Sequence, residues 1–232
     1  MPIHCLVAQA VEKPWGRTDI PPHVAASDGS SIGEVWFLPV QGIDLPLLVK
    51  YIFTSEKLSV QVHPNDEQAR QYGLAGGKSE CWYVLDAAPD ARLGIGLCQD
   101  LTSEELSVAA LDGSIEALME WKPVHPGSFY YIPAGTVHAI GGGVALVEIQ
   151  QNNDVTYRLY DYGRPREFAQ PGAARITEYI VRWQRDCRKP DHRPTLRPAR
   201  SCDRPGLGRC LRQSKRPNLA HSPGGAADRP LR

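Results

Sequence analysis

Short apolar or alternating segments recur along the first 160 residues and predict β-strands. Each segment has the length of a strand and is bounded by Gly, Pro, Asn or Asp, which favour turns. The expected strands cover residues 34–38, 47–53, 58–63, 80–85, 91–95, 128–132, 136–140, 144–149 and 156–160. Because the strands are many and short and no internal repeat is present, we expect an all-β sandwich or jelly roll.

The N-terminal segment departs from this pattern. Residues 1–31 contain Pro14-Trp15-Gly16 and Asp28-Gly29, and such turn-forming residues predict an irregular arm laid over the core rather than a domain.

A second departure lies at residues 102–121, which begin with Thr102-Ser-Glu-Glu, the pattern of a helix N-cap. Leu106, Ala109, Ala110 and Leu111 then fall on one helical face. We therefore predict one or two short helices, inserted between strands.

The charge distribution predicts a boundary near residue 168. The 232 residues are 42% hydrophobic and 22% charged, which is typical of a globular protein with one sizeable core. The formal net charge is zero, so the total favours neither nucleic acid nor an anionic membrane as a partner. Residues 1–167, however, hold 11 Lys and Arg against 21 Asp and Glu, whereas residues 168–232 hold 15 against 5.

The basic segment 168–232 also holds 8 of the 20 prolines and shows almost no apolar periodicity. Such a segment buries too little apolar surface to offset the entropy of ordering, so we predict that it is largely disordered. We expect one domain at residues 1–167 and an Arg/Pro-rich tail at 168–232. A basic arm that binds nucleic acid is the alternative for the tail, but its spacing of aromatic residues gives no support for docking.

The six cysteines form no CxxC pair, so the sequence suggests neither a thiolate zinc site nor a redox motif. We expect free thiols. No stretch approaches 18 apolar residues and the N-terminus lacks the pattern of a signal peptide, so we expect a cytoplasmic protein.

Three polar residues share one face of the strand predicted at 58–63. The strand period of two places Ser59, Gln61 and His63 on one side, with Val60 and Val62 on the other. The inward face of a small barrel is normally apolar, and a polar stripe there needs a polar partner. A metal ion would satisfy that need.

Two further candidate ligands, Glu80 and His138, lie on other predicted strands. Imidazole nitrogens with carboxylate and amide oxygens suit zinc, with iron or manganese as alternatives. Taken singly, each His is more often a hydrogen-bonded structural residue, and Glu80 reads as a solvated strand end. Their combination within a QxHP motif at 61–64 and a PxGxxHAxGxG motif at 133–143 favours a shared metal site, because these are the two motifs with which cupins place metal ligands.

The chain resembles the type I mannose-6-phosphate isomerases, in particular the short bacterial form. The matching stretches are KPWG at 13–16, GEVWF at 33–37, LSVQVHPND at 58–66, GKSECWYV at 77–84, IPAGTVHAI at 132–140 and LVEIQQNNDVTYRLYD at 146–161. The resemblance implies a cupin jelly-roll barrel, one zinc ion per chain, and interconversion of mannose 6-phosphate with fructose 6-phosphate.

The resemblance also implies roles for individual residues. The metal ligands of the family fall on Gln61, His63, Glu80 and His138, its phosphate contacts on Ser59 and Lys78, and its active-site residues on Arg158 and Glu148. Such an isomerase moves a proton between adjacent carbons through a cis-enediol while the remote phosphate holds the sugar.

Outside the resemblance, Lys78 and Ser59 also read as a surface lysine and a strand hydroxyl, and Glu148 as a solvated residue on an outer face. The match ends near Glu167, where the chain continues in the basic tail. Two other functions therefore stay open. One is an iron-dependent cupin oxygenase, which uses two His and one carboxylate. The other is a catalytically impaired cupin that binds a sugar phosphate.

Overall fold

The computed structural model describes residues 5–24, 29–40, 43–71 and 73–164. The predicted disordered tail at 168–232, and the domain boundary before it, lie outside the described residues. No helix within the described ranges is long and apolar enough to cross a membrane.

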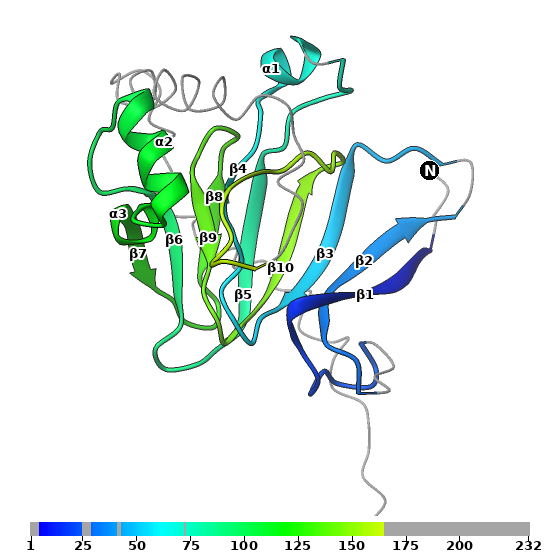
Figure 1. The fold of residues 1–232 in the computed structure, drawn as a ribbon. Coiled ribbons are helices and arrows are strands. Elements are labelled where there is room, and N and C mark those ends of the chain that lie inside the picture. The colour runs from blue at the N-terminus through cyan, green and yellow to red at the C-terminus, as the bar shows by residue number, and fades with distance from the viewer. Residues whose placement is uncertain (1–4, 25–28, 41–42, 72, 165–232) are drawn as a thin grey trace, which may run out of the picture. The chain divides into compact units, whose positions relative to one another are not determined.

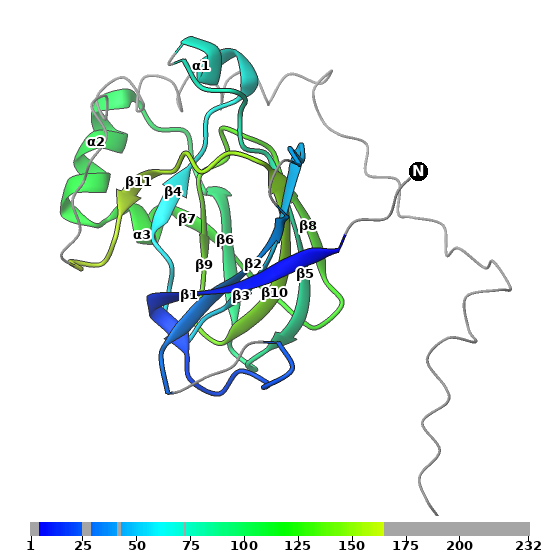
Figure 2. The same cartoon turned by 90° about the vertical axis from the view of Figure 1, so that its right-hand side faces the viewer.

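Two antiparallel sheets face each other around the core, as Figures 1 and 2 show. The six-stranded sheet has the order β1 (Leu6–Arg17), β2 (Ile32–Pro39), β3 (Leu47–Phe53), β10 (Val144–Gln151), β5 (Glu80–Ala87) and β8 (Phe129–Ile132). The five-stranded sheet has the order β11 (Tyr157–Tyr160), β4 (Val60–Val62), β9 (His138–Ile140), β6 (Arg92–Leu97) and β7 (Met119–Pro123). This architecture confirms the predicted cupin-like fold.

The helices lie outside the sheets (Figure 1). They are α1 (Asp66–Gln71), α2 (Ser103–Asp112) and α3 (Ile115–Leu118). The predicted N-cap is confirmed, because the Thr102 hydroxyl accepts from the Glu105 amide and the Glu105 side chain accepts from the Thr102 amide. The small helical insertion is confirmed as well. The helical face was wrong at Leu111, which is 87% exposed, because only Leu106 and Ala109 turn fully into the core.

The N-terminal arm was also wrong, because Leu6–Arg17 forms β1 and pairs with β2. Two irregularities in register, at Val11/Glu12 and between Glu12 and Arg17, accommodate Pro14 and Gly16. Proline lacks an amide hydrogen, and it is tolerated here because β1 is an edge strand. Strand β7 and helix α1 were not predicted.

Apolar side chains fill the space between the sheets and beneath the helices. One cluster, which includes Trp82, Leu93 and Leu146, packs inside the barrel. A second cluster joins Val60 and Val62 to α2 and α3. Since Val60 and Val62 point toward the helices, the alternate residues Ser59 and Gln61 point into the barrel, as the strand period predicted.

Candidate metal centre and adjoining cavity

Three predicted metal ligands meet inside the barrel although they come from separate strands. Glu80 opens β5, His138 opens β9 and His63 directly follows β4. Nε2 of His63 lies 3.1 Å from Oε1 of Glu80, and Nε2 of His138 lies 3.7 Å from Oε2 of Glu80. One donor atom from each residue lies within 4.8 Å of the others, and all three residues are buried.

Backbone carbonyls orient both imidazoles. Nδ1 of His63 lies 2.8 Å from the carbonyl oxygen of Val155, and Nδ1 of His138 lies 2.9 Å from that of Thr136. Since a carbonyl oxygen can only accept, each Nδ1 carries the hydrogen and each neutral ring presents the lone pair of Nε2 to Glu80. Carbonyls behind ligating histidines are the usual way in which proteins fix this tautomer.

Electrostatics keep the two imidazoles neutral. Burial and the neighbouring Lys78 ammonium lower the pKa of His63 to about 3, against the opposing effect of Glu80. Burial likewise lowers the pKa of His138, again opposed by the Glu80 carboxylate. A neutral imidazole is the form that binds a metal ion.

The predicted fourth ligand, Gln61, lies beside His138. The two residues pair across β4 and β9, and Nε2 of Gln61 lies 3.2 Å from Nε2 of His138. The Ser59 hydroxyl donates to Oε1 of Gln61 at 3.2 Å. Rotating the amide by 180° would turn its oxygen toward the histidines.

Lys78 contributes a positive charge to the same group of donors. Its Nζ lies 2.9 Å from Oε1 of Glu80 and 3.3 Å from Nε2 of His63, and the residue is buried. Burial alone would lower the pKa of Lys78, but the carboxylates of Glu80 and Glu148 raise it. In turn, burial would raise the pKa of Glu80, but the Lys78 ammonium holds it well below its ordinary value.

The donor set fits a divalent metal. Two oriented neutral imidazoles and an ionised carboxylate converge on a place that already holds a cationic group. Nitrogen and oxygen donors of this kind suit zinc, iron and manganese. Within the described ranges, no other group of three or more His, Cys, Asp and Glu has this convergence.

Glu148 lies on the inward side of β10 and is buried, so the alternative reading of a solvated residue on an outer face was wrong. Its Oε2 accepts from the Trp82 indole at 3.0 Å, and its Oε1 lies 3.5 Å from Nζ of Lys50. Burial, together with the charge of Glu80, raises the pKa of Glu148 to about 7, against the lowering effect of the two lysines Lys50 and Lys78.

A cavity of about 390 Å³ opens beside these groups. Its walls include Ser59, Gln61, Lys78, Glu148 and Arg158. Arg158 is exposed, and its side chain makes no hydrogen bond or ion pair with another residue in the described part of the chain. All eight candidate site residues therefore lie at the metal centre or on the wall of this cavity.

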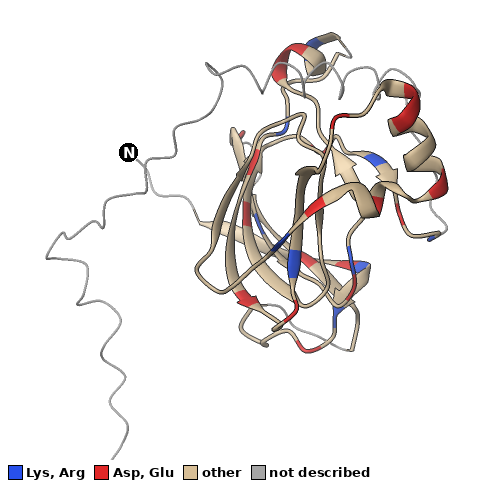
Figure 3. Cartoon of the chain, turned by 90° about the vertical axis from the view of Figure 1, so that its left-hand side faces the viewer, with Lys and Arg blue, Asp and Glu red and all other residues tan. Residues whose placement is uncertain are grey.

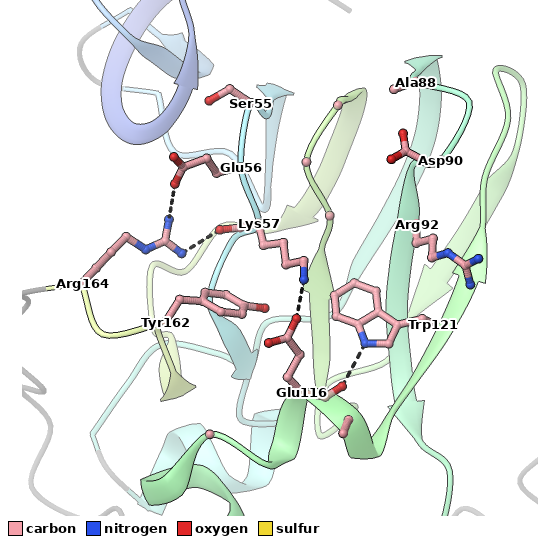
Figure 4. A pocket seen from close by; sticks show the side chains of 15 residues that line it. Ser55, Glu56, Lys57, Ala88, Asp90, Arg92, Glu116, Trp121, Tyr162 and Arg164 are labelled. Carbon is pink, nitrogen blue, oxygen red and sulfur yellow. Dashed lines mark hydrogen bonds and ion pairs between the residues drawn. The ribbon is translucent and has the colours of Figure 1, made fainter.

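A larger cavity of about 1140 Å³ lies elsewhere, between Ser55–Lys57, the Gly141–Gly143 turn and α3. Several of its charged side chains are paired with one another, as Lys57 with Glu116 and Arg164 with Glu56 (Figure 4). It holds none of the donors described above, so we place the candidate site in the smaller cavity.

The sequence reasoning missed Lys50, Trp82, Glu34 and Asp154, which contribute to this site. Lys50, Glu34 and Asp154 line the cavity, and Trp82 binds Glu148. The available signal was strand parity, because Lys50 pairs with Glu148 across β3 and β10 and so shares its inward side.

Comparisons with known proteins agree with the geometry. The chain is 44% identical over 143 residues to the mannose-6-phosphate isomerase ManA of Bacillus subtilis, covering 59% of this chain and 45% of that protein. It is 39% identical over 135 residues to a Streptococcus mutans mannose-6-phosphate isomerase, covering 58% of this chain and 42% of that protein. The chain thus spans less than half the length of these relatives. No family model matches it.

The fold has solved counterparts. The crystal structure of the Bacillus subtilis mannose-6-phosphate isomerase matches 71% of this chain and 63% of its own length, with a TM-score of 0.63 and 30% identity. An Archaeoglobus fulgidus protein described as a putative mannosephosphate isomerase matches at a TM-score of 0.58 and 23% identity, over 68% and 63% of the two chains, and supports the fold alone.

Proposed function

We propose that this chain, a homologue of the mannose-6-phosphate isomerases over the matched stretch, is a zinc-dependent aldose–ketose isomerase that interconverts mannose 6-phosphate and fructose 6-phosphate. The observation that carries the proposal is the convergence of two oriented imidazoles and Glu80 beside a cavity lined by Lys78, Arg158 and Glu148. The activity of the much longer relatives makes this substrate pair the first to test.

His63, Glu80 and His138 would hold the zinc ion, with Gln61 as a fourth ligand. When bound, the ion supplies Lewis-acid stabilisation of negative charge on the sugar oxygens, worth several kcal/mol. A divalent cation there would also compete with Lys78 for Glu80, because both are positively charged. The Lys78 ammonium then becomes available to an anionic substrate.

Glu148 is our candidate for the group that moves the proton between the two carbons through a cis-enediol. Its carboxylate lines the cavity, and Lys50 and Trp82 hold it in one orientation. Its pKa of about 7 lies close to neutral pH, where a carboxylate is both ionised and basic enough to act as a general base. A bound cation nearby would lower this pKa.

Ser59, Lys78 and Arg158 are our candidates for binding the phosphate and orienting the sugar. They lie on the wall of the same cavity, and Arg158 presents a guanidinium without a partner among the described residues. A planar guanidinium with several donors matches the oxygens of a phosphate or of a developing enediolate.

The two alternative functions would use the same site for different chemistry. An iron-dependent oxygenase would use the same two His and one carboxylate, but the lysine and arginine on the cavity wall serve an anionic substrate better than dioxygen. A cupin that binds a sugar phosphate without turnover would use the same lysine and arginine on the cavity wall, so a binding measurement alone does not separate it from an isomerase.

The test is a coupled assay of fructose 6-phosphate formation from mannose 6-phosphate by the purified, zinc-loaded chain. We expect turnover that disappears with a chelator and returns with zinc. Calorimetric binding of mannose 6-phosphate without turnover would support the impaired binding protein. Substrate-dependent oxygen uptake by the iron-loaded chain would support the oxygenase, and absence of both binding and turnover would contradict the proposal.

A further inference from the structure

The outward side of the six-stranded sheet carries two unbroken rows of uncharged residues. The first row is Ala8, Phe37, Val49, Ile149, Cys81 and Tyr131, and the second is Ala10, Val35, Tyr51, Val147, Tyr83 and Phe129. An antiparallel sheet with one face in water normally alternates apolar residues with polar ones on the solvent side. In these two rows no position on any of the six strands is charged, so this part of the face has the composition of a buried surface.

Part of this face is covered by the chain itself. Ile20 and Val24, from the connection between β1 and β2, pack with Val35 and Phe53 in a cluster on the outward side. The other end of the face stays open: Phe129 is 57% exposed, Tyr83 48%, Tyr131 45% and Ile149 38%. We refer to these four residues as the open apolar face.

The open apolar face has the size of the apolar centre of an interface. An aromatic side chain offers about 200 Å² of surface, so the three half-exposed rings together with Ile149 present roughly 350 Å². A stable interface buries about 800 Å² on each partner, including a polar rim around its apolar centre. The face therefore supplies the apolar centre that a stable dimer needs.

We propose that the open apolar face pairs with the same face of a second copy of this chain. A two-fold axis brings identical patches together, and a patch without charges does so without like-charge repulsion. Packing of sheet on sheet at about 10 Å is the usual way in which such faces are buried.

The chain's own C-terminal segment fits this face less well than a second copy does. The described chain ends at Arg164, after β11 at the edge of the other sheet, where its guanidinium donates to the carbonyl of Lys57 and pairs with Asp161. Residues 168–232 carry 15 Lys and Arg, and the two rows offer them no carboxylate. Acidic side chains gather instead on α1 and α2 (Figure 3).

The test is to measure the mass of the full chain by sedimentation velocity at concentrations of about 1 to 50 µM. The fraction of a reversible dimer rises with protein concentration over such a range. We expect twice the chain mass of 25.6 kDa at the upper end. Phe129→Glu and Tyr83→Glu should each shift the equilibrium to monomer by at least about tenfold in dissociation constant, because each places a charge in the centre of the interface.

The matched control is Leu111→Glu, which introduces the same charge at a more exposed leucine on α2. It should leave the dimer intact. A monomeric wild-type chain, or a Phe129→Glu variant that is folded and still dimeric, would overturn the proposal.

Hydroxyl-radical footprinting of the wild-type chain covers the case in which the variants fail to fold. Oxidation of Phe129, Tyr83 and Tyr131 should fall as the chain is concentrated, while oxidation of Leu111 stays constant. Protection of the three rings at every concentration in a monomer would mean that the chain's own remaining segment covers them, and the dimer would be excluded. None of these measurements depends on metal or on isomerase activity.

Discussion

An ordinary half-exposed sheet is apolar toward the core and polar toward solvent. In the six-stranded sheet, by contrast, the inward side carries buried charges and much of the outward side is apolar. Toward the barrel interior, β10 and β3 present Glu148 and Lys50 as a buried ion pair. Toward the exterior, the neighbouring residues Val147 and Ile149 belong to rows without charge. The contrast agrees with the proposed reaction on the inner side and with the proposed pairing of the outer side with a second copy of the chain.

Removal of a metal donor should produce the largest effect on the inner side. We expect His138→Ala to lose most of the bound zinc and to lower kcat/KM by roughly a thousandfold or more, since the metal supplies several kcal/mol of charge stabilisation. Zinc analysis and the coupled assay measure both losses. His125→Ala, at an exposed histidine, is the matched control and should retain both. Full zinc occupancy in His138→Ala would refute the ligand assignment.

Lys78→Ala should act mainly on substrate binding. We expect KM for mannose 6-phosphate to rise about 10- to 100-fold, because a charged hydrogen bond to a phosphate is lost. Zinc content should be unchanged, since the substitution removes a competing cation rather than a ligand. The control is Lys122→Ala on β7 of the five-stranded sheet, and this variant should have the KM of the wild type. An unchanged KM would mean that Lys78 does not bind the phosphate and that its ion pair with Glu80 has only a structural role.

Glu148 should make the stability of the metal-free chain depend on pH. Its folded pKa of about 7 lies above the ordinary value of 4.5, so the folded state binds this proton more tightly than the unfolded state. The contribution of Glu148 to the free energy of unfolding is therefore fully present below about pH 4.5 and is lost as the pH rises through about 7. Glu148→Gln should remove a change of about 3 kcal/mol in the free energy of unfolding across that window.

Denaturant unfolding at a series of pH values measures this slope. Glu120→Gln, an exposed carboxylate on β7, provides the control and should leave it unchanged. A Glu148→Gln variant with the wild-type slope would mean that Glu148 titrates normally.

Lys50→Met should shift the pH profile of the reaction by a smaller amount. Lys50 lowers the pKa of Glu148, so its removal raises that pKa and requires a higher pH to ionise the proposed base. We expect the acidic limb of kcat/KM against pH to move up by about one unit in the zinc-loaded variant. A limb that stays in place, or moves down, would argue against Glu148 as the base.

Strand period and turn residues predicted most of this fold. The boundaries of β3 match the predicted strand at 47–53, and the start of β10 at Val144 matches as well. Strand β1 was missed because Pro14 and Gly16 read as a break, whereas the paired edge strand accommodates them in irregular register. Strand β7 offers only Met119 and Trp121 as large apolar residues, too few for an alternating pattern to be recognised.

The residues of the candidate site could be predicted from the sequence mainly where they lie in a recognised motif. The ligand positions followed from the family resemblance and from the parity of the strand around Gln61. Lys50 was missed because a lysine in an apolar strand reads as solvated, and its parity became informative only once β3 was known to pair with β10 beside Glu148. The carbonyls that orient the two histidines belong to Val155 and Thr136, and backbone partners leave no trace in side-chain patterns.

The proposed zinc-dependent isomerase can be tested by titrating the metal-free chain with zinc and following isomerase activity at each step. We expect turnover of mannose 6-phosphate to rise in proportion to bound zinc and to stop rising at about one ion per chain, as one set of ligands with an open coordination position requires. Activity that is present without bound metal, or one tightly bound zinc per chain without any turnover, would contradict it.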